Sequence, residues 1–498
     1  MKKLLALLLA LLMVAGTVMM VACGGEKDPE QGKDDPVVDP KDPTDPTDPT
    51  DPTDPTDPTD PTDPVDPVDP GKDPDRKYLD NLPEQMDFGG EEMRFVMRDS
   101  NVLIEEPDKM NDGDAVAKAV YDRQTEIEAR FNVIFGGNTA DMAAHTWGDA
   151  RDEIDRSVTA GTDEYDLGSV HMKFGAYLAT SGKLRNMNKL TNIDFTQDYW
   201  NHVFTDNFTY KSTQYWATGD IVTGYLYELV GMYVDDTLWE TSTGSSINAL
   251  FDLVFGGEWT LDKMFEFTQN VYEDTNNNGS RDVGDTFGWV YASTEWVQSA
   301  VMICAGYDYS VKSGSKYELN LASSEDELIY SAVKHVMFPR ENTYVLPCND
   351  PTSEFVNGRA LFFHQTLDKL VSSDFRSREM PWSVVPMPKY SVEDQYRASC
   401  YDGISIVGVP ATLPYERYEM VGAVTEALAG AGQKYVTQAV FETAFKAKAA
   451  RNEGSFKALD IIRENGYADF AFCWCGPLGE IDKFTANAIG GGVGSAGS

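Results

Sequence analysis

The stretch Met93-Arg94-Phe95-Val96-Met97 has the composition of a buried strand and ends in the polar Arg98-Asp99-Ser100. A helix is expected next, because Asp114 can cap a segment whose apolar residues recur at helical spacing. The elements expected after it are a strand at 133–135, a helix over about 140–160 and a strand at 165–170. Alternating strands and helices are typical of a parallel sheet, so the sequence predicts an α/β fold.

Open α/β sheets bind ligands beyond the carboxyl ends of their strands. The residues that follow the first and third expected strands are therefore candidates for the mouth of a binding site, namely Arg98, Asp99, His171 and Met172.

The same alternation starts again further along the chain. Strands are expected at 230–234, 287–291, 360–363, 382–385 and 403–409, with a helix over 260–272 and helical periodicity over 416–464. The globular region of about 420 residues exceeds one hydrophobic core, so two lobes are expected.

Composition limits the function. The 498 residues include 41 Lys and Arg against 81 Asp and Glu, giving a net charge of -40. A nucleic-acid binder needs a basic surface, so that class is excluded. Hydrophobic residues make up 42%, which is enough to bury a core.

The N-terminus reads as a targeting signal. Two lysines precede an apolar run that ends at Ala22, as in a secretory signal peptide over residues 1–22. Cys23 follows the small residue directly, which resembles the lipobox of bacterial lipoproteins and implies cleavage before Cys23 and lipidation of its thiol. An ordinary secreted protein with an incidental Cys23 is the alternative.

A Pro- and Asp-rich tether follows over residues 23–77, with an Asp-Pro-Thr repeat from Asp42 to Thr62. Proline at every third position prevents helix and sheet, and the like charges extend the chain. Residues 26–75 contain 18 acidic and 4 basic residues, a charge of -14, which leaves -28 for residues 76–498. The folded part is therefore acidic in its own right.

Five further cysteines are present, at 304, 348, 400, 473 and 475. An odd number excludes a complete set of disulfides, and the spacing of Cys473 and Cys475 is too short for a usual zinc knuckle. We expect core or half-exposed thiols.

Short motifs in a fixed order cover nearly the whole globular region. They are Asp114-Ala115-Val116-Ala117-Lys118-Ala119-Val120-Tyr121-Asp122-Arg123, Tyr165-Asp166, Asp198-Tyr199-Trp200-Asn201, Ala217-Thr218-Gly219-Asp220, Gly257-Glu258-Trp259-Thr260, Val385-Pro386-Met387-Pro388-Lys389, Phe445-Lys446-Ala447-Lys448 and Arg451-Asn452. With the lipobox, this order resembles the extracellular solute-binding lipoproteins of ABC importers, of the sugar-binding type from Gram-positive bacteria.

The resemblance implies a two-lobe periplasmic-binding-protein-like fold with a hinge, crossed near Tyr233, Lys389 and Gly432. Lobe 1 would comprise 78–232 and 390–432, lobe 2 would comprise 233–389 and 433–485, and a Gly-rich tail would follow over 486–498. Because relatives usually carry another helix there, the C-terminus is expected to be truncated or altered.

The implied function is capture of a carbohydrate by lobe closure and delivery to an ABC permease. The protein would be a monomer held by its lipid anchor on the extracellular face of the membrane. A secreted carbohydrate-active hydrolase and a cell-surface adhesin remain alternatives. No nucleophile elbow, zinc-protease helix or phosphate loop is present, so no catalytic residue is assigned.

Residues 274–285 reproduce the spacing of a calcium loop, with oxygen ligands at positions 1, 3 and 5, Gly279 at position 6 and an acid at position 12. The predicted ligands are Asp274, Asn276, Asn278, the Ser280 carbonyl and Asp285. Few charged ligands predict weak binding of a structural calcium. A metal-free turn is the alternative.

Sugars present C–H faces to aromatic rings and hydroxyls to polar side chains. Residues of these types at loop-like positions are the candidate ligand contacts, although each aromatic could equally be a core ring. They are Trp200, Trp216, Asp220, Tyr225, Trp296, Tyr401, Asp402 and Trp474.

Overall fold

The computed structural model describes residues 76–98, 114–136, 148–314, 316–320, 324–338, 344–449, 452–483 and 487. The chain divides into two units, residues 1–66 and 67–498, and every element below belongs to the second. The predicted signal peptide, Cys23, nearly all of the tether, Asp99 and the end of the tail lie outside the described residues. No helix within the described ranges combines the length and apolarity that crossing a membrane requires.

Five strands form the first sheet, in the order β2 (Val133–Gly136), β1 (Glu91–Met97), β3 (Leu167–His171), β14 (Ser405–Gly408) and β6 (Trp216–Ala217). β1 pairs in parallel with both β2 and β3, whereas β14 runs antiparallel to β3 and β6. β3 and β14 are buried along their whole length, as expected for strands covered on both faces.

The second sheet also has five strands, in the order β11 (Val345–Cys348), β8 (Phe287–Ala292), β12 (Ala360–Thr366), β7 (Val230–Asp235) and β13 (Trp382–Val385). β11, β8 and β12 are parallel, and β7 runs against both of its neighbours. The prediction of parallel sheets is therefore only partly correct. β7 and β14 are reversed because each begins after the chain has crossed from the other sheet.

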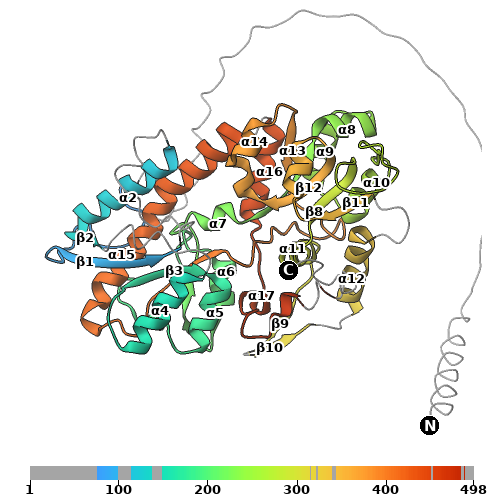
Figure 1. Cartoon of the computed structure of the whole chain (residues 1–498). Coiled ribbons are helices and arrows are strands. Elements are labelled where there is room, and N and C mark those ends of the chain that lie inside the picture. The colour runs from blue at the N-terminus through green and yellow to red at the C-terminus, as the bar shows by residue number, and fades with distance from the viewer. Residues whose placement is uncertain are drawn as a thin grey trace, which may run out of the picture. The chain divides into compact units, whose positions relative to one another are not determined.

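Helices cover the first sheet on both faces (Figure 1). They are α2 (Ala115–Phe131), α4 (Asp149–Ala160), α5 (Met172–Thr180), η3 (Met187–Lys189), α6 (His202–Phe208), α7 (Gly224–Tyr227), η5 (Tyr415–Arg417) and α15 (Tyr418–Ala431). α4 packs on β1 and β3, and α5 packs on β3 and β14. Asp114 caps α2 as predicted, because its carboxylate accepts from the amides of Val116 and Ala117.

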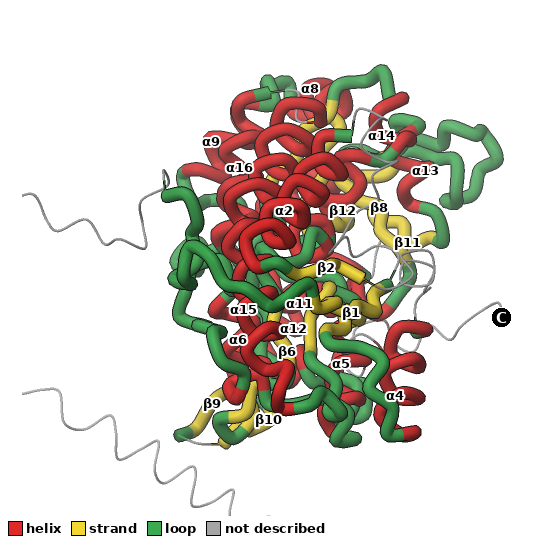
Figure 2. The backbone as a smooth tube through the Cα atoms, turned by 90° about the vertical axis from the view of Figure 1, so that its left-hand side faces the viewer, coloured by secondary structure: helices red, strands yellow, loops and turns green. Residues whose placement is uncertain are grey.

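The helices of the second sheet are α8 (Asp236–Thr243), α9 (Asn248–Phe255), α10 (Leu261–Thr268), α11 (Glu295–Cys304), α12 (Ser324–Met337), α13 (Pro351–Val356), η4 (Leu367–Val371), α14 (Ser373–Ser377) and α16 (Glu453–Glu464). In Figure 2, α8, α9, α13, α14 and α16, in red, lie around β8, β11 and β12, in yellow. α8 and α16 contact β13, whereas α10 and α13 contact β8. The two small hairpins are β4 (Thr209–Tyr210) with β5 (Thr213–Gln214), and β9 (Ser310–Ser313) with β10 (Lys316–Leu319).

The segment 433–485, which we expected in lobe 2, contacts both groups of elements. α16 packs on β13 and α9 of the second sheet's lobe. By contrast, the π-helix η6 (Gly432–Thr437) packs on α2 and α15, and the π-helix η7 (Ala439–Ala449) contacts both α2 and η4 (Figure 1). α17 (Phe470–Cys473) packs on α5 and α6. This part of the chain therefore passes from the first lobe to the second and back.

Two of the crossings pair with each other as an antiparallel ribbon. The amide of Val230 donates to the carbonyl of Ser399 at 2.9 Å, and the amide of Tyr401 donates to the carbonyl of Glu228 at 3.0 Å. Leu229 and Cys400 lie opposite each other between these bonds.

The third crossing segment pairs with the second one along its opposite edge. The amide of Ala398 donates to the carbonyl of Asn465 at 2.7 Å, and the amide of Tyr467 donates to Ala398 at 2.8 Å. We call the three segments together the hinge: residues 228–230, 398–401 and 465–467. Adjacent extended connections of this kind permit rotation of two lobes about one axis.

Candidate ligand-binding site

A pocket of about 380 Å³ lies against the hinge and draws residues from both lobes. We call it the front pocket, and it is lined by Arg98, Gly224, Tyr227, Glu228, Trp296, Thr366, Asp368 and Tyr401.

The carboxyl ends of strands in both sheets supply the front pocket. Arg98 directly follows β1, and its amide continues the sheet by donating to the carbonyl of Ser169 at 3.2 Å. Trp296 lies in the first turn of α11, just after β8, and Asp368 lies in η4, just after β12. The pocket is therefore where the fold class predicts a ligand site.

Two predicted residues form the aromatic part of this pocket. The rings of Trp296 and Tyr401 are 5.1 Å apart between centroids and meet edge to face at 70°. Both side chains are half-buried, so ring surface remains available to a ligand. Both were among the candidate ligand contacts, and the structure brings them together in this pocket.

Arg98 and Glu228 are the charged pair of the front pocket. A guanidinium nitrogen of Arg98 donates to the carbonyl of Gly403 at 2.7 Å and lies 3.5 Å from a carboxyl oxygen of Glu228. Burial raises the pKa of Glu228 to about 8, although the charge of Arg98 opposes this shift. Nε of Arg98 is buried and has no hydrogen-bond acceptor among the described residues. This nitrogen therefore remains able to donate a hydrogen bond to a ligand.

Asp402 lies one residue beyond Tyr401 and faces a different set of charges. Its carboxylate is 4.0 Å from Nζ of Lys173. Burial, together with the nearby charge of Asp482, raises the pKa of Asp402 to about 6. Asp402 is thus beside the front pocket, although it is not part of its lining.

His171 and Met172, which we placed at the mouth of the binding site, do not line the front pocket. The His171 ring packs against Tyr401 at 5.7 Å and lies so close to Gly403 that a Cβ there would be 2.0 Å from it. Position 403 therefore requires glycine. Met172 is wholly buried and belongs to the core.

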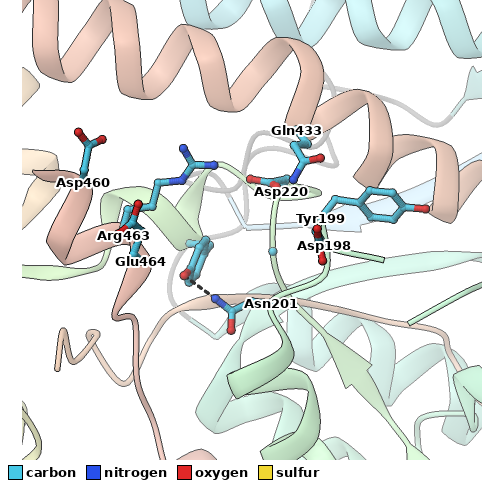
Figure 3. Close-up of a pocket in the computed structure, with 10 residues that line it drawn as sticks. Asp198, Tyr199, Asn201, Asp220, Gln433, Asp460, Arg463 and Glu464 are labelled. Carbon is cyan, nitrogen blue, oxygen red and sulfur yellow. Dashed lines mark hydrogen bonds between the residues drawn. The ribbon is translucent and has the colours of Figure 1, made fainter. Parts of the chain in front are cut away.

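Asp220 and Tyr225 lie in another pocket, of about 350 Å³ (Figure 3). We call this second cavity the rear pocket, and it is lined by Asp198, Tyr199, Asn201, Gly219, Asp220, Tyr225, Gln433, Asp460, Arg463 and Glu464. The predicted ligand residues are therefore divided between two cavities.

The structure places the other three predicted tryptophans in the core, which corrects their assignment as ligand contacts. Trp200 is fully buried and donates from Nε1 to Glu426 at 3.1 Å. Trp216 is fully buried against Trp474, with 4.5 Å between ring centroids. Trp474 donates to the carbonyl of Asn207 at 3.0 Å, so its polar atom is satisfied within the fold.

Glu228 and Asp368 are pocket residues that the sequence analysis did not single out. Glu228 is the one charge in the otherwise uncharged run from Gly224 to Val234. A lone carboxylate in a run that becomes buried needs a specific reason, and this was a usable signal. Asp368 follows a strand and could have been found by the carboxyl-end rule.

The calcium-loop residues form a tight turn of the expected kind. Gly279 has φ +74°, and the carboxylate of Asp274 accepts from the amides of Asn278 at 3.2 Å and Gly279 at 3.0 Å. Asp285 is wholly buried and accepts from the hydroxyl of Tyr272 at 3.2 Å. Hydrogen bonds within the turn thus hold the Asp274 and Asp285 carboxylates in place.

The donor set of this loop is weak. Within the described ranges, no three acidic, His or Cys side chains gather as metal ligands. The loop offers two predicted carboxylates, with the amide oxygens of Asn276 and Asn278 and the carbonyl of Ser280 as the other donors. These residues fit a hard, weakly held cation such as calcium and do not fit zinc.

All five cysteines from 304 onward are buried free thiols. The expectation of core thiols agrees with this arrangement.

The chain resembles known proteins in its fold. No family model matches the sequence, and no curated protein matches it. Among solved structures, the ABC substrate-binding protein Lmo0181 from Listeria monocytogenes in complex with cycloalternan has 13% identity and a TM-score of 0.49, with 81% of this chain and 94% of that chain covered. The GacH receptor of Streptomyces glaucescens, solved unliganded and with acarbose and an acarbose homolog, has 12% identity and a TM-score of 0.51, with the same coverages. The chain shares the fold of the GacH receptor, in agreement with the fold that the sequence predicted.

Proposed function

We propose that this protein captures a saccharide in the front pocket and holds it by rotation of the two lobes about the hinge. The observation that carries the proposal is the meeting of Trp296, Tyr401 and the Arg98–Glu228 pair in one pocket built from both lobes. An aromatic face supports the C–H side of a sugar, and charged planar groups bond its hydroxyls.

Lobe closure is expected because the residues that line the front pocket come from both lobes. Arg98 belongs to the first sheet's lobe, whereas Trp296 and Asp368 belong to the second. A ligand that contacts both sides binds the closed arrangement better than the open one and so shifts the population toward it.

The test is a glycan panel applied to the full chain, read by tryptophan emission and by melting temperature. Acarbose and cycloalternan, the ligands of the two similar structures, belong in the panel with glucose, maltose and longer oligosaccharides. We expect at least one saccharide to raise the melting temperature and to change the emission of Trp296. Release of product from a chromogenic glycoside, or no response to any glycan, would contradict the proposal.

A matched pair of variants assigns the signal to the pocket. Trp296→Phe keeps an aromatic ring but alters emission, and Trp296→Ala removes the ring. Binding should survive the first change and weaken sharply with the second. Equal binding by both variants would place the ligand elsewhere.

The remaining parts of the proposal concern location and partners. We propose that Cys23 carries a lipid anchor on the extracellular face of the membrane and that the loaded protein docks on an ABC permease. The charge of -14 over residues 26–75 supports an extended tether between anchor and binding domain. Cys23→Ser should move the protein from the membrane fraction to the medium.

We also propose that the loop at 274–285 holds a structural calcium ion. Asp274, Asn276, Asn278, Ser280 and Asp285 would be its ligands, and the ion would tie the end of α10 to the start of β8.

A further inference from the structure

The rear pocket lies on the opposite face of the hinge from the front pocket. Side chains of an extended segment alternate between its two faces. Glu228 lines the front pocket. Its neighbour Leu229 points the other way, because a Cβ on Gly466 would lie 3.5 Å from Leu229 and 2.8 Å from the hydroxyl of Tyr225, a rear-pocket residue.

Both lobes supply walls of the rear pocket. α16, which packs on the second sheet, provides Asp460, Arg463 and Glu464. The other wall belongs to the first lobe, where the amide of Asp220 donates to the carbonyl of Tyr199 at 2.9 Å. Gly219, with φ +142°, makes this approach possible, since a Cβ there would be 2.3 Å from that carbonyl.

The central polar groups face each other without pairing. Figure 3 shows the Arg463 side chain extending toward Asp220. Among the described residues the Arg463 side chain forms no ion pair or hydrogen bond and lies over the Phe441 ring, 5.2 Å from its centroid. Asp220, nine-tenths buried, accepts from the hydroxyl of Thr437 at 2.5 Å. Burial raises the pKa of Asp220, and the charge of Arg463 opposes the shift.

The lining chemistry disfavours an anion. Four carboxylates, on Asp198, Asp220, Asp460 and Glu464, outnumber the single guanidinium of Arg463, although Lys446 offsets the charge of Asp460 from 2.6 Å. The charged and amide side chains are all planar groups that can make two parallel hydrogen bonds, and Tyr225 adds an aromatic ring. Vicinal hydroxyls match this set, because one can donate to a carboxylate while the next accepts from a guanidinium.

We propose that the rear pocket binds a small polyhydroxy compound, either a sugar unit or an acyclic polyol. Its volume of about 350 Å³ is at the lower end of the range for ligand sites, which favours a compound no larger than a disaccharide.

A ligand here is coupled to the front pocket. When two lobes close on one face of a hinge, their walls separate on the opposite face. A polyol that bridges α16 and the Asp220 wall resists that separation and therefore opposes capture in the front pocket. By linkage the effect is reciprocal, so front-pocket ligand also weakens rear binding. This coupling rests on the proposed function, whereas rear binding itself does not.

The test uses the full chain with sorbitol and maltose as probes and ligand-observed NMR titration as the readout. Five proteins are compared: the unmodified chain, Arg463→Met, Trp296→Ala, Trp296→Ala with Arg463→Met, and Trp296→Ala with Lys457→Met. Lys457 is a matched control, because it is an exposed cation of the same helix outside the pocket. We expect Trp296→Ala to keep polyol binding, Arg463→Met to weaken it at least about tenfold, and Lys457→Met to leave it unchanged.

Glu464→Ala is a second variant that should not disturb folding, because Glu464 is exposed at the rim of the rear pocket. Its loss should weaken polyol binding only a few-fold without lowering the melting temperature. Binding that Arg463→Met leaves intact, or binding of glycine or putrescine in place of the polyols, would overturn the proposed site. If Arg463→Met abolishes all saccharide binding while Trp296→Ala changes none, the rear site stands and the front-pocket function falls.

The coupling between the two pockets is measured separately. The affinity of the glycan-panel ligand should fall about fivefold or more in saturating sorbitol, and not in Arg463→Met. An unchanged affinity in the unmodified chain would refute the coupling.

Discussion

Asp166 in the first lobe and Glu228 in the front pocket are both buried carboxylates, and they are compensated very differently. Asp166 receives two arginines: Arg94 Nη2 lies 2.7 Å from Oδ1, and Arg417 Nη2 lies 2.7 Å from Oδ2. Glu228 has a single arginine, Arg98, at 3.5 Å.

The pKa values of the two groups follow this difference. Hydrogen bonds from Arg94 and Arg417 lower the pKa of Asp166 in spite of its burial. The pKa of Glu228 instead rises to about 8. A fully compensated carboxylate stabilises the fold, whereas an incompletely compensated one keeps hydrogen-bonding capacity for a ligand.

The largest expected effect is on stability, from Asp166→Asn. Removing one partner of a buried ion pair costs about 3–5 kcal/mol, because it leaves the arginines uncompensated. Denaturant unfolding measures the change. Glu164→Gln is the control, since the Glu164–Arg156 pair two residues away is partly exposed and contributes at most about 1 kcal/mol. Equal losses from both variants would show that burial does not distinguish them.

The next effect is on affinity, from Trp296→Ala. Loss of a partly buried aromatic contact should cost about 2 kcal/mol, or about thirtyfold in Kd, with little change in stability. Titration with the glycan-panel ligand measures it. Tyr415→Ala is the control, because that ring is 79% exposed and lines neither pocket. A thirtyfold loss from Tyr415→Ala as well would point to an indirect effect.

Glu228→Gln tests the raised pKa. A carboxyl protonated up to about pH 8 in the fold but ionised above about pH 4.3 when unfolded makes stability fall as pH rises between these values. Its slope is at most about 1.4 kcal/mol per pH unit. Other buried carboxyls also have raised pKa values, about 6 for Asp402 and about 7 for Glu426, so Glu228→Gln should flatten the profile chiefly between about pH 7 and 8.

The pKa shift of Asp166 makes stability depend on pH in the opposite direction. Its lowered pKa gives stability that is present above about pH 4 and is lost as pH falls further. Glu228→Gln should therefore leave the acid limb of the unfolding profile unchanged. A variant that keeps the decline between about pH 7 and 8 would show that another group produces it.

The strands could be predicted from the sequence because a buried strand needs a continuous apolar run. Residues 93–97, 230–234 and 382–385 all lie in strands of the structure. The reversed directions of β7 and β14 could not be predicted, because direction depends on where the chain crosses between the sheets.

The site was harder to predict because burial of a given aromatic depends on distant residues. Trp200 and Trp296 both have the local sequence of loop tryptophans, yet Trp200 is fully buried and donates a hydrogen bond to Glu426, which is 226 residues away. Similarly, Asp220 and Tyr401 fall in different pockets because the hinge separates them. No local pattern records which face of the hinge a residue will occupy.

The calcium loop offers a third kind of carboxylate with which to sharpen the comparison. Asp285 is as buried as Asp166, but the bonds it accepts come from Tyr272 and from the amides of Asn276 and Asp282. If a cation supplies the missing positive charge, calcium should stabilise the protein and EDTA should lower its melting temperature.

The expected change is the smallest of the four. A site that binds at about millimolar concentration contributes less than about 1 kcal/mol in 2 mM calcium, since mass action gives RT ln(1 + [L]/Kd). Melting curves in calcium and in EDTA measure it for the full chain and for Asp274→Asn, which removes one ligand charge at a half-buried position. The variant should lose the response to calcium and keep its EDTA melting temperature. An unmodified chain that melts identically in both buffers would show that the loop's own amides suffice for Asp285, and that compensation by hydrogen bonds alone can hold a buried carboxylate here.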